Sequence, residues 1–125
     1  MKNSEIIASH EALNEILRKN EKYPVRVSYA ISKNAKALEN LMMDFETERN
    51  KLLDRYNASD EEGTPTYKKT GKIDIAEEFE EQWKKDMTEL LDIDVEFNPH
   101  MVPIVEFPEV IEPRILHALS FMIEE

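Results

Sequence analysis

The chain has 125 residues, of which 27 are acidic and 16 are basic, so its formal net charge at pH 7 is −11. This length fits a single domain. The absence of cysteine excludes a disulfide framework, a thiolate zinc site and a cysteine nucleophile. No uncharged stretch approaches the roughly 18 residues of a membrane span, and the first residues lack the apolar core of a signal peptide. A cytoplasmic protein without membrane contact is expected.

The charge is distributed unevenly along the chain. Residues 1–57 carry ten basic and nine acidic side chains, whereas residues 58–125 carry six basic and eighteen acidic ones. The second part therefore repels the phosphates of nucleic acids and of anionic membranes. Direct nucleic-acid binding is disfavoured, and the acidic half serves either solubility or a positively charged protein partner.

Two helices joined by an extended segment are predicted in the first part of the chain. Residues 4–20 place apolar side chains about one helical turn apart, with Ser4 as the expected N-cap. Residues 23–27 alternate apolar and polar side chains around Pro24, which indicates extended chain, and Ser28 is the expected cap of the next helix.

The second helix is predicted over residues 29–56 and has the most regular pattern in the sequence. Its stripe advances in alternating steps of four and three, a heptad pattern with one charged interruption: Ile31, Ala35, Leu38, Met42, Phe45, Arg49, Leu52 and Tyr56. Such a helix is about 42 Å long, whereas a compact domain of this size is about 36 Å across. In an antiparallel helical hairpin the shorter first helix covers only part of the stripe. The C-terminal half or a second copy of the chain must cover the rest.

The second half combines extended and helical segments. Residues 66–69 and 72–75 flank Thr70-Gly71, which predicts a small β-hairpin. Asp74 to Glu77 matches a capping box for a third helix over residues 75–91.

Residues 93–125 combine two extended segments with a last helix. Residues 93–97 have the alternation of a half-buried strand, and residues 101–110 suit an edge strand or a packed extended arm because two prolines interrupt them. Pro113 fits the first turn of a last helix. The predicted fold is therefore α+β and mainly α, in one domain over residues 1–125: a long helical hairpin over 1–57, then an acidic α+β half over 58–125 with a small β element and two shorter helices.

A metal site is the sharpest chemical candidate. Alternate residues of a strand project to one face, so the carboxylates in this segment form a possible Mg²⁺ or Mn²⁺ site, with the candidate ligands Asp92, Asp94, Glu96 and His100. Acidic residues equally suit the solvated face of a strand whose other face is buried. The simpler interpretation is preferred, so no metal, cofactor or catalytic residue is assigned.

An acidic run opens the third predicted helix, formed by Glu77, Glu78, Glu80 and Glu81. Negative charge there stabilises the positive end of the helix dipole, which is a sufficient structural role. The alternative is functional: the run imitates a row of phosphates and occupies the basic groove of a nucleic-acid enzyme.

Self-association is predicted through the long helix. Its proposed contact residues are Leu38, Met42, Phe45, Arg49 and Leu52. If nothing covered them, these residues would expose a contiguous apolar patch of roughly several hundred Å². Monomeric proteins rarely expose a patch of this area. Within a dimer the arginine of this set would need a carboxylate from the other chain, which Glu46, Glu48 or Asp54 offers.

The sequence resembles a family of small phage and prophage proteins of uncharacterised function. The resemblance is carried by Pro24 to Asn34, Leu38, Glu48-Arg49, Leu52-Leu53, Tyr56, Tyr67 to Lys72, Glu78 to Phe97 and Pro113 to Glu125. The resemblance implies a viral accessory or assembly protein and supplies no catalytic or ligand residue.

The expected function is that of a non-enzymatic phage accessory or assembly protein in the cytoplasm of a bacterial host. It acts through self-association and through contact with a phage or host protein. The alternative is an acidic inhibitor that mimics nucleic acid, and the third hypothesis is a divalent-metal enzyme using Asp92, Asp94 and Glu96.

Overall fold

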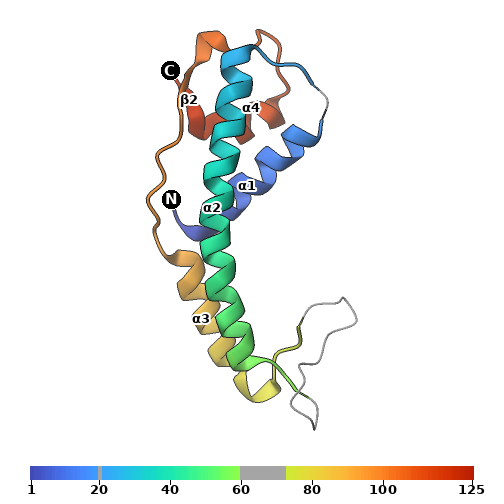
Figure 1. Ribbon diagram of the computed structural model, residues 1–125, viewed down its shortest axis with the longest axis vertical. Coiled ribbons are helices and arrows are strands. Elements are labelled where there is room, and N and C mark those ends of the chain that lie inside the picture. Colours follow the sequence, from blue (N-terminus) through green and yellow to red (C-terminus); the bar gives the residue numbers. More distant parts are fainter. Residues whose placement is uncertain (20, 60–72) are drawn as a thin grey trace. The chain divides into compact units, whose positions relative to one another are not determined.

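The computed structural model describes residues 1–19, 21–59 and 73–125. Within these ranges the chain is mainly helical and has one small sheet, so the α+β, mainly α class is confirmed (Figure 1). The helices are α1 (Asn3–Arg18), α2 (Val25–Tyr56), α3 (Glu80–Asp92) and α4 (Pro113–Leu119), with the 3₁₀ turns η1 (Glu77–Phe79), η2 (Ile104–Glu106) and η3 (Ser120–Met122). None of the helices in the described ranges combines the length and apolar character needed to cross a membrane.

Helix α1 begins earlier than the sequence predicts. Lys2 occupies the N-cap position, and its backbone N–H donates to the Glu5 carboxylate at 3.0 Å. Ser4 therefore lies inside the helix, and the prediction that it is the cap is wrong. A glutamate in the first turn satisfies a free backbone donor and favours the positive end of the dipole.

Helix α2 also begins earlier, at Val25, so the predicted extended segment over 23–27 is wrong in its second half. Pro24 lies immediately before the helix, where its missing N–H costs nothing and its fixed φ favours the first turn. The Ser28 N–H donates to the Pro24 carbonyl at 2.9 Å, so Ser28 is already inside the helix and does not cap it. The long helix predicted up to Tyr56 is confirmed.

The described chain divides into two compact units. The first comprises Met1–Met42 with Asp94–Glu125, and the second comprises Met43–Ile93. These boundaries divide α2 itself, whereas the sequence pattern placed the division after residue 57. The single domain stays a prediction.

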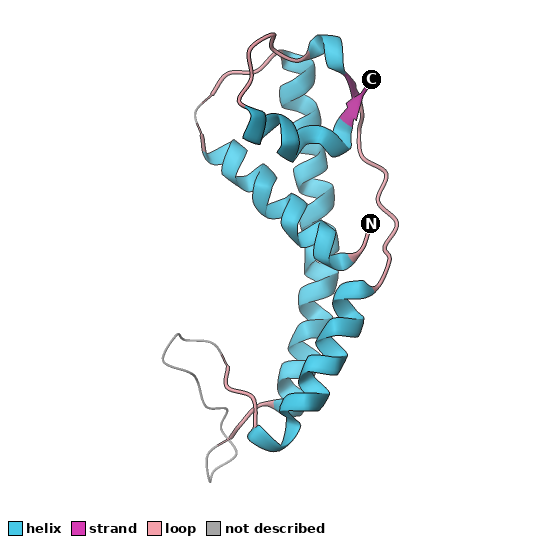
Figure 2. Ribbon diagram, turned by 180° about the vertical axis from the view of Figure 1, so that it is seen from behind, coloured by secondary structure: helices cyan, strands magenta, loops and turns pink. Residues whose placement is uncertain are grey.

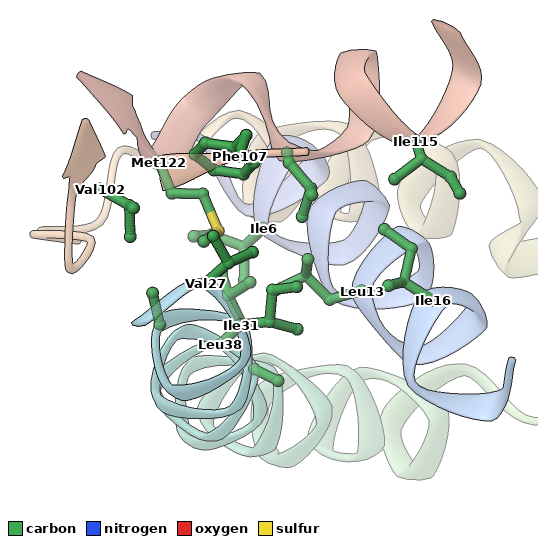
Figure 3. Close-up of a cluster of buried hydrophobic side chains, with 13 residues drawn as sticks. Ile6, Leu13, Ile16, Val27, Ile31, Leu38, Val102, Phe107, Ile115 and Met122 are labelled. Atoms are coloured by element: carbon green, nitrogen blue, oxygen red, sulfur yellow. The ribbon is translucent and has the colours of Figure 1, made fainter. Parts of the chain in front are cut away.

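The first unit is organised around a core drawn from α1, the first part of α2 and the C-terminal segment. Figure 3 shows side chains of all three converging, and the fully buried ones include Ile6, Leu13, Ile31, Leu38 and Met122. Helix α4 packs on α1, and in Figure 1 α1 crosses obliquely away from α2. A close antiparallel hairpin of α1 and α2 is therefore not confirmed, because the C-terminal segment shares the core between them.

Pro113 is the first residue of α4, as predicted. The sheet differs from the predicted hairpin: β1 (Val102–Pro103) and β2 (Ile123–Glu124) are parallel, with Val102 opposite Ile123. The hairpin turn around Thr70-Gly71 lies outside the described residues. The predicted strand over 93–97 is wrong, because only Asp94 finds a bridge partner. That partner is Lys2, and the chain enters α1 directly after it, so the ladder cannot continue.

The second unit packs α3 along the last turns of α2, as both views show (Figure 2). Tyr56 is buried, and its hydroxyl donates to the Asp86 carboxylate at 2.5 Å. Gln82 donates to the other oxygen of this carboxylate at 2.9 Å. The hydrogen bond from Tyr56 lowers the pKa of Asp86 below its ordinary value of 3.8. The hydrogen bond between the Tyr56 hydroxyl and the charged Asp86 carboxylate thus links α2 to α3 in this unit.

The expected capping box at the start of the third helix does not form. Ala76 occupies the N-cap position of η1 without a side-chain cap, and α3 follows from Glu80. The backbone explains the difference, since the Asp74 carbonyl accepts from Ala58 N–H at 2.7 Å and the Ala76 N–H donates to the Tyr56 carbonyl at 2.9 Å. These bonds hold the segment to the end of α2.

We expect Tyr56→Phe to raise the pKa of Asp86 toward its ordinary value, because the hydroxyl that stabilises the carboxylate is lost. The lowered pKa stabilises the native protein above pH 3.8, and this contribution is lost as the pH falls through the folded-state pKa. The difference in unfolding free energy between wild type and variant should therefore be larger at about pH 6 than at about pH 2. Carboxyl NMR titration and denaturant unfolding measure both effects. Tyr29→Phe, at an exposed tyrosine, is the control, and an equal change there would contradict the assignment.

Candidate functional site

A groove with a cavity volume of about 390 Å³ lies at the N-terminal end of α2, within the first unit. Its walls are the first turns of the helix and an extended segment of the C-terminal part, and the lining residues are Val25, Arg26, Tyr29, His100, Met101, Val102 and Pro103. This set of residues is called the α2 groove below. It joins residues more than seventy positions apart in the sequence.

The helical period places the lining residues of α2 outside the core. Val27, Ala30 and Ile31 belong to the buried cluster, whereas Val25, Arg26 and Tyr29 lie on the exposed side of the helix. Val25 is 85% exposed and Tyr29 is 58% exposed, which is unusual for side chains of this size. The groove is therefore an apolar surface that the fold leaves in water.

A buried asparagine fixes the second wall of the groove. Asn34 is 1% exposed, its Oδ1 accepts from the His100 N–H at 2.7 Å, and its Nδ2 donates to the His100 carbonyl at 3.0 Å. The same Nδ2 lies 3.4 Å from the Met122 sulfur. Because both backbone groups of His100 are bound, the segment that follows is held against α2 in one register.

The rim of the groove is cationic. Arg26 is mostly exposed and lies 3.4 Å from the Glu106 carboxylate, whereas the Lys33 ammonium lies 5.8 Å from the centre of the Tyr29 ring. The His100 ring meets the same tyrosine edge-on at 5.5 Å. Lys36 lies one turn further along this exposed face. The site therefore combines apolar and positively charged surface on a chain whose net charge is −11.

The residues predicted for self-association do not form an exposed stripe. Leu38 is fully buried in the first unit and Phe45 is buried in the second, while Met42 and Leu52 are half-buried. Of the two covers expected for this stripe, the C-terminal half supplies the one at Leu38, which lies in the same buried cluster as Leu119. Leu38 and Phe45 are therefore not available to a partner, and self-association itself stays a prediction.

Arg49, the charged interruption of the stripe, is half-buried. Its guanidinium carbon lies 5.9 Å from the centre of the Phe45 ring, and its Nε has no hydrogen-bond partner among the described residues. A carboxylate partner from a second chain stays a prediction.

The metal candidates have separate surroundings. Asp92 is the last residue of α3, and the Asp94 carboxylate lies 3.9 Å from the N-terminal ammonium. Glu96 accepts from the Asn98 amide at 3.4 Å, and His100 belongs to the α2 groove. Across residues 1–19, 21–59 and 73–125, no three side chains of metal-binding type are grouped. The predicted alternation depended on a strand that does not form.

The acidic run lies where the sequence placed it. Glu77 and Glu78 are in η1, Glu80 and Glu81 open α3, and all four are exposed. Phe79 lies between them, 38% exposed, with its ring 5.5 Å from that of Tyr56.

Two features of the sequence hide the α2 groove. Val25 lies in a stretch that alternates like an extended segment, and the charges of residues 1–57 nearly cancel when they are summed. A shorter window provides a signal, since residues 18–36 carry six basic side chains and one acidic one. The second wall gives no local signal, because His100 to Pro103 reach α2 only through the tertiary fold.

Comparison with protein-family models, with curated proteins and with solved structures finds no match to this chain.

We expect Asn34→Ala to lower the unfolding free energy by about 1–3 kcal/mol, because the His100 backbone loses both partners. Denaturant unfolding measures this, and hydrogen exchange at the His100 amide should accelerate. Asn40→Ala, an exposed position on the same helix, should change stability by less than about 0.5 kcal/mol. Equal effects of the two substitutions would contradict the assignment of a stabilising clamp, by which we mean the two hydrogen bonds between the Asn34 side chain and the His100 backbone.

Proposed function

We propose that this chain is a non-enzymatic protein-binding protein and that the α2 groove is its binding surface. The observation that carries the proposal is the exposed apolar lining of the groove inside a cationic rim. Contiguous exposed apolar surface bordered by polar groups is typical of protein interaction sites. Aromatic and arginine side chains, here Tyr29 and Arg26, are the types that contribute most to protein interfaces.

The surroundings of the groove favour a protein partner over a nucleic acid. Ile104 and Val105 follow the groove wall directly in sequence, and Val105 is 85% exposed. Apolar aliphatic side chains contribute little to phosphate binding, which depends on clusters of cations.

The biological setting in this proposal comes from the resemblance to small phage and prophage proteins. The chain would act in the cytoplasm of a bacterial host, as an accessory or assembly factor that contacts a phage or host protein or another copy of itself. The α2 groove gives such a factor a defined contact surface, which the resemblance alone does not supply.

A paired substitution tests this function. Val25→Glu introduces a carboxylate into the groove, and at the first residue of α2 it favours the helix dipole, so folding should be preserved. Val110→Glu makes the same change at a 91% exposed valine that does not line the groove. With tagged chain expressed in its native cells, a partner protein should be retained by wild type and by Val110→Glu and lost by Val25→Glu. Retention of the same proteins by all three chains would contradict the proposal.

The second candidate is the acidic inhibitor that mimics nucleic acid. It is favoured by the four exposed glutamates of η1 and α3, for which no ion pair occurs among the described residues. Under this alternative the retained partner is a nucleic-acid enzyme. Its capture should survive Val25→Glu and be lost when Glu77, Glu78, Glu80 and Glu81 are changed to glutamine.

A further inference from the structure

We propose that the α2 groove of one chain receives the segment Glu77–Glu81 of a second copy. In this arrangement Phe79 packs on Val25, Tyr29 and Met101. The flanking glutamates approach Lys33 and replace Glu106 in its exposed ion pair with Arg26. The inference rests on the proposed function, because it names the occupant of the same groove.

The α2 side of the groove is locally basic. Residues 25–36 carry three basic side chains and no acidic one, and Arg26 and Lys33 are both exposed. The apolar lining needs an apolar occupant, whereas the rim needs a negatively charged one. The groove therefore fits an apolar side chain flanked by carboxylates.

The segment Glu77–Glu81 has this composition. It places one aromatic ring between two pairs of exposed glutamates, and it lies in the second unit while the groove lies in the first. Phe79 leaves 38% of its surface in water although its ring packs on Tyr56. The exposed edge is the part available to a partner.

The two kinds of contact have different consequences. A single exposed ion pair adds little to affinity, but several together add measurably to it, raise the association rate and select the partner. The apolar contact between Phe79 and the groove supplies the rest of the affinity. Association should therefore weaken with salt, as the Debye length falls from about 10 Å at 0.1 M to about 3 Å at 1 M.

The contact is head-to-tail, because each chain uses a different surface on each side. Such interfaces close into rings or continue as open chains, unlike a two-fold dimer in which one patch meets itself. The average mass of the wild type should therefore rise with protein concentration beyond that of a dimer if the chain stays open.

Sedimentation of complementary variants tests the proposal. Val25→Glu blocks the groove, and the fourfold glutamine variant of Glu77, Glu78, Glu80 and Glu81 blocks the segment. Each alone should be monomeric, with association weakened on the order of tenfold or more. Mixed together, they retain one intact groove and one intact segment, so they should form a one-to-one complex that does not grow further.

Matched controls carry the same charge changes elsewhere. Val110→Glu controls the groove variant, and Glu11→Gln, Glu39→Gln, Asp44→Asn and Glu124→Gln together control the segment variant, since all lie at exposed positions. Both controls should associate as the wild type does. If Val25→Glu fails to fold, Arg26→Gln with Lys33→Gln replaces it, because both side chains are exposed.

Two results would overturn the inference. One is a wild-type chain that stays monomeric at millimolar concentration, and the other is a wild type that associates while the mixed variants do not. If the chain stays monomeric but captures an unrelated protein through the groove, the inference of self-association is wrong and the proposed function is still supported. If the chain stays monomeric and captures no protein through the groove, both the inference and the proposed function are wrong.

Discussion

The pairing of a buried asparagine with the backbone of a distant residue determines how the C-terminal segment lies on α2. An amide placed among apolar side chains is costly unless its donor and acceptor are both used. Asn34 meets this requirement at a single residue, His100, through one accepted and one donated hydrogen bond. Only one register of the segment satisfies both bonds, so the clamp selects position as well as adding stability.

That register determines which side chains of the segment are buried. Successive residues of an extended chain point to opposite sides, so Val102 enters the core at 2% exposure while Met101 stays 42% exposed. Val102 then pairs with Ile123, the residue after the buried Met122. The α2 groove is therefore a by-product of core formation, since its lining consists of buried Val102 and of neighbours, such as Met101, that this register leaves outside the core.

Local sequence pattern predicted the helices well and their surroundings poorly. The stripe of α2 marks buried positions correctly at Ile31, Leu38, Phe45 and Tyr56. Periodicity states which face is covered, but it contains no information about the element that covers it. At Leu38 the cover comes from residues more than sixty positions later, and no spacing within the helix indicates this. The failed strand over 93–97 has the same cause, because alternation specifies a face but not a neighbouring strand.

The net charge of a long stretch of sequence does not reveal the local charge around the α2 groove. Over residues 1–57 the charges nearly cancel, yet the exposed face at the start of α2 is cationic and the start of α3 is strongly acidic. At physiological ionic strength a charge acts over about 8 Å, so two approaching surfaces respond mainly to the groups directly opposite them. Repulsion between two anionic chains is screened at longer range, and the local pairing decides whether close approach continues. A chain with a net charge of −11 can therefore present one small surface whose local charge is opposite to that of the whole.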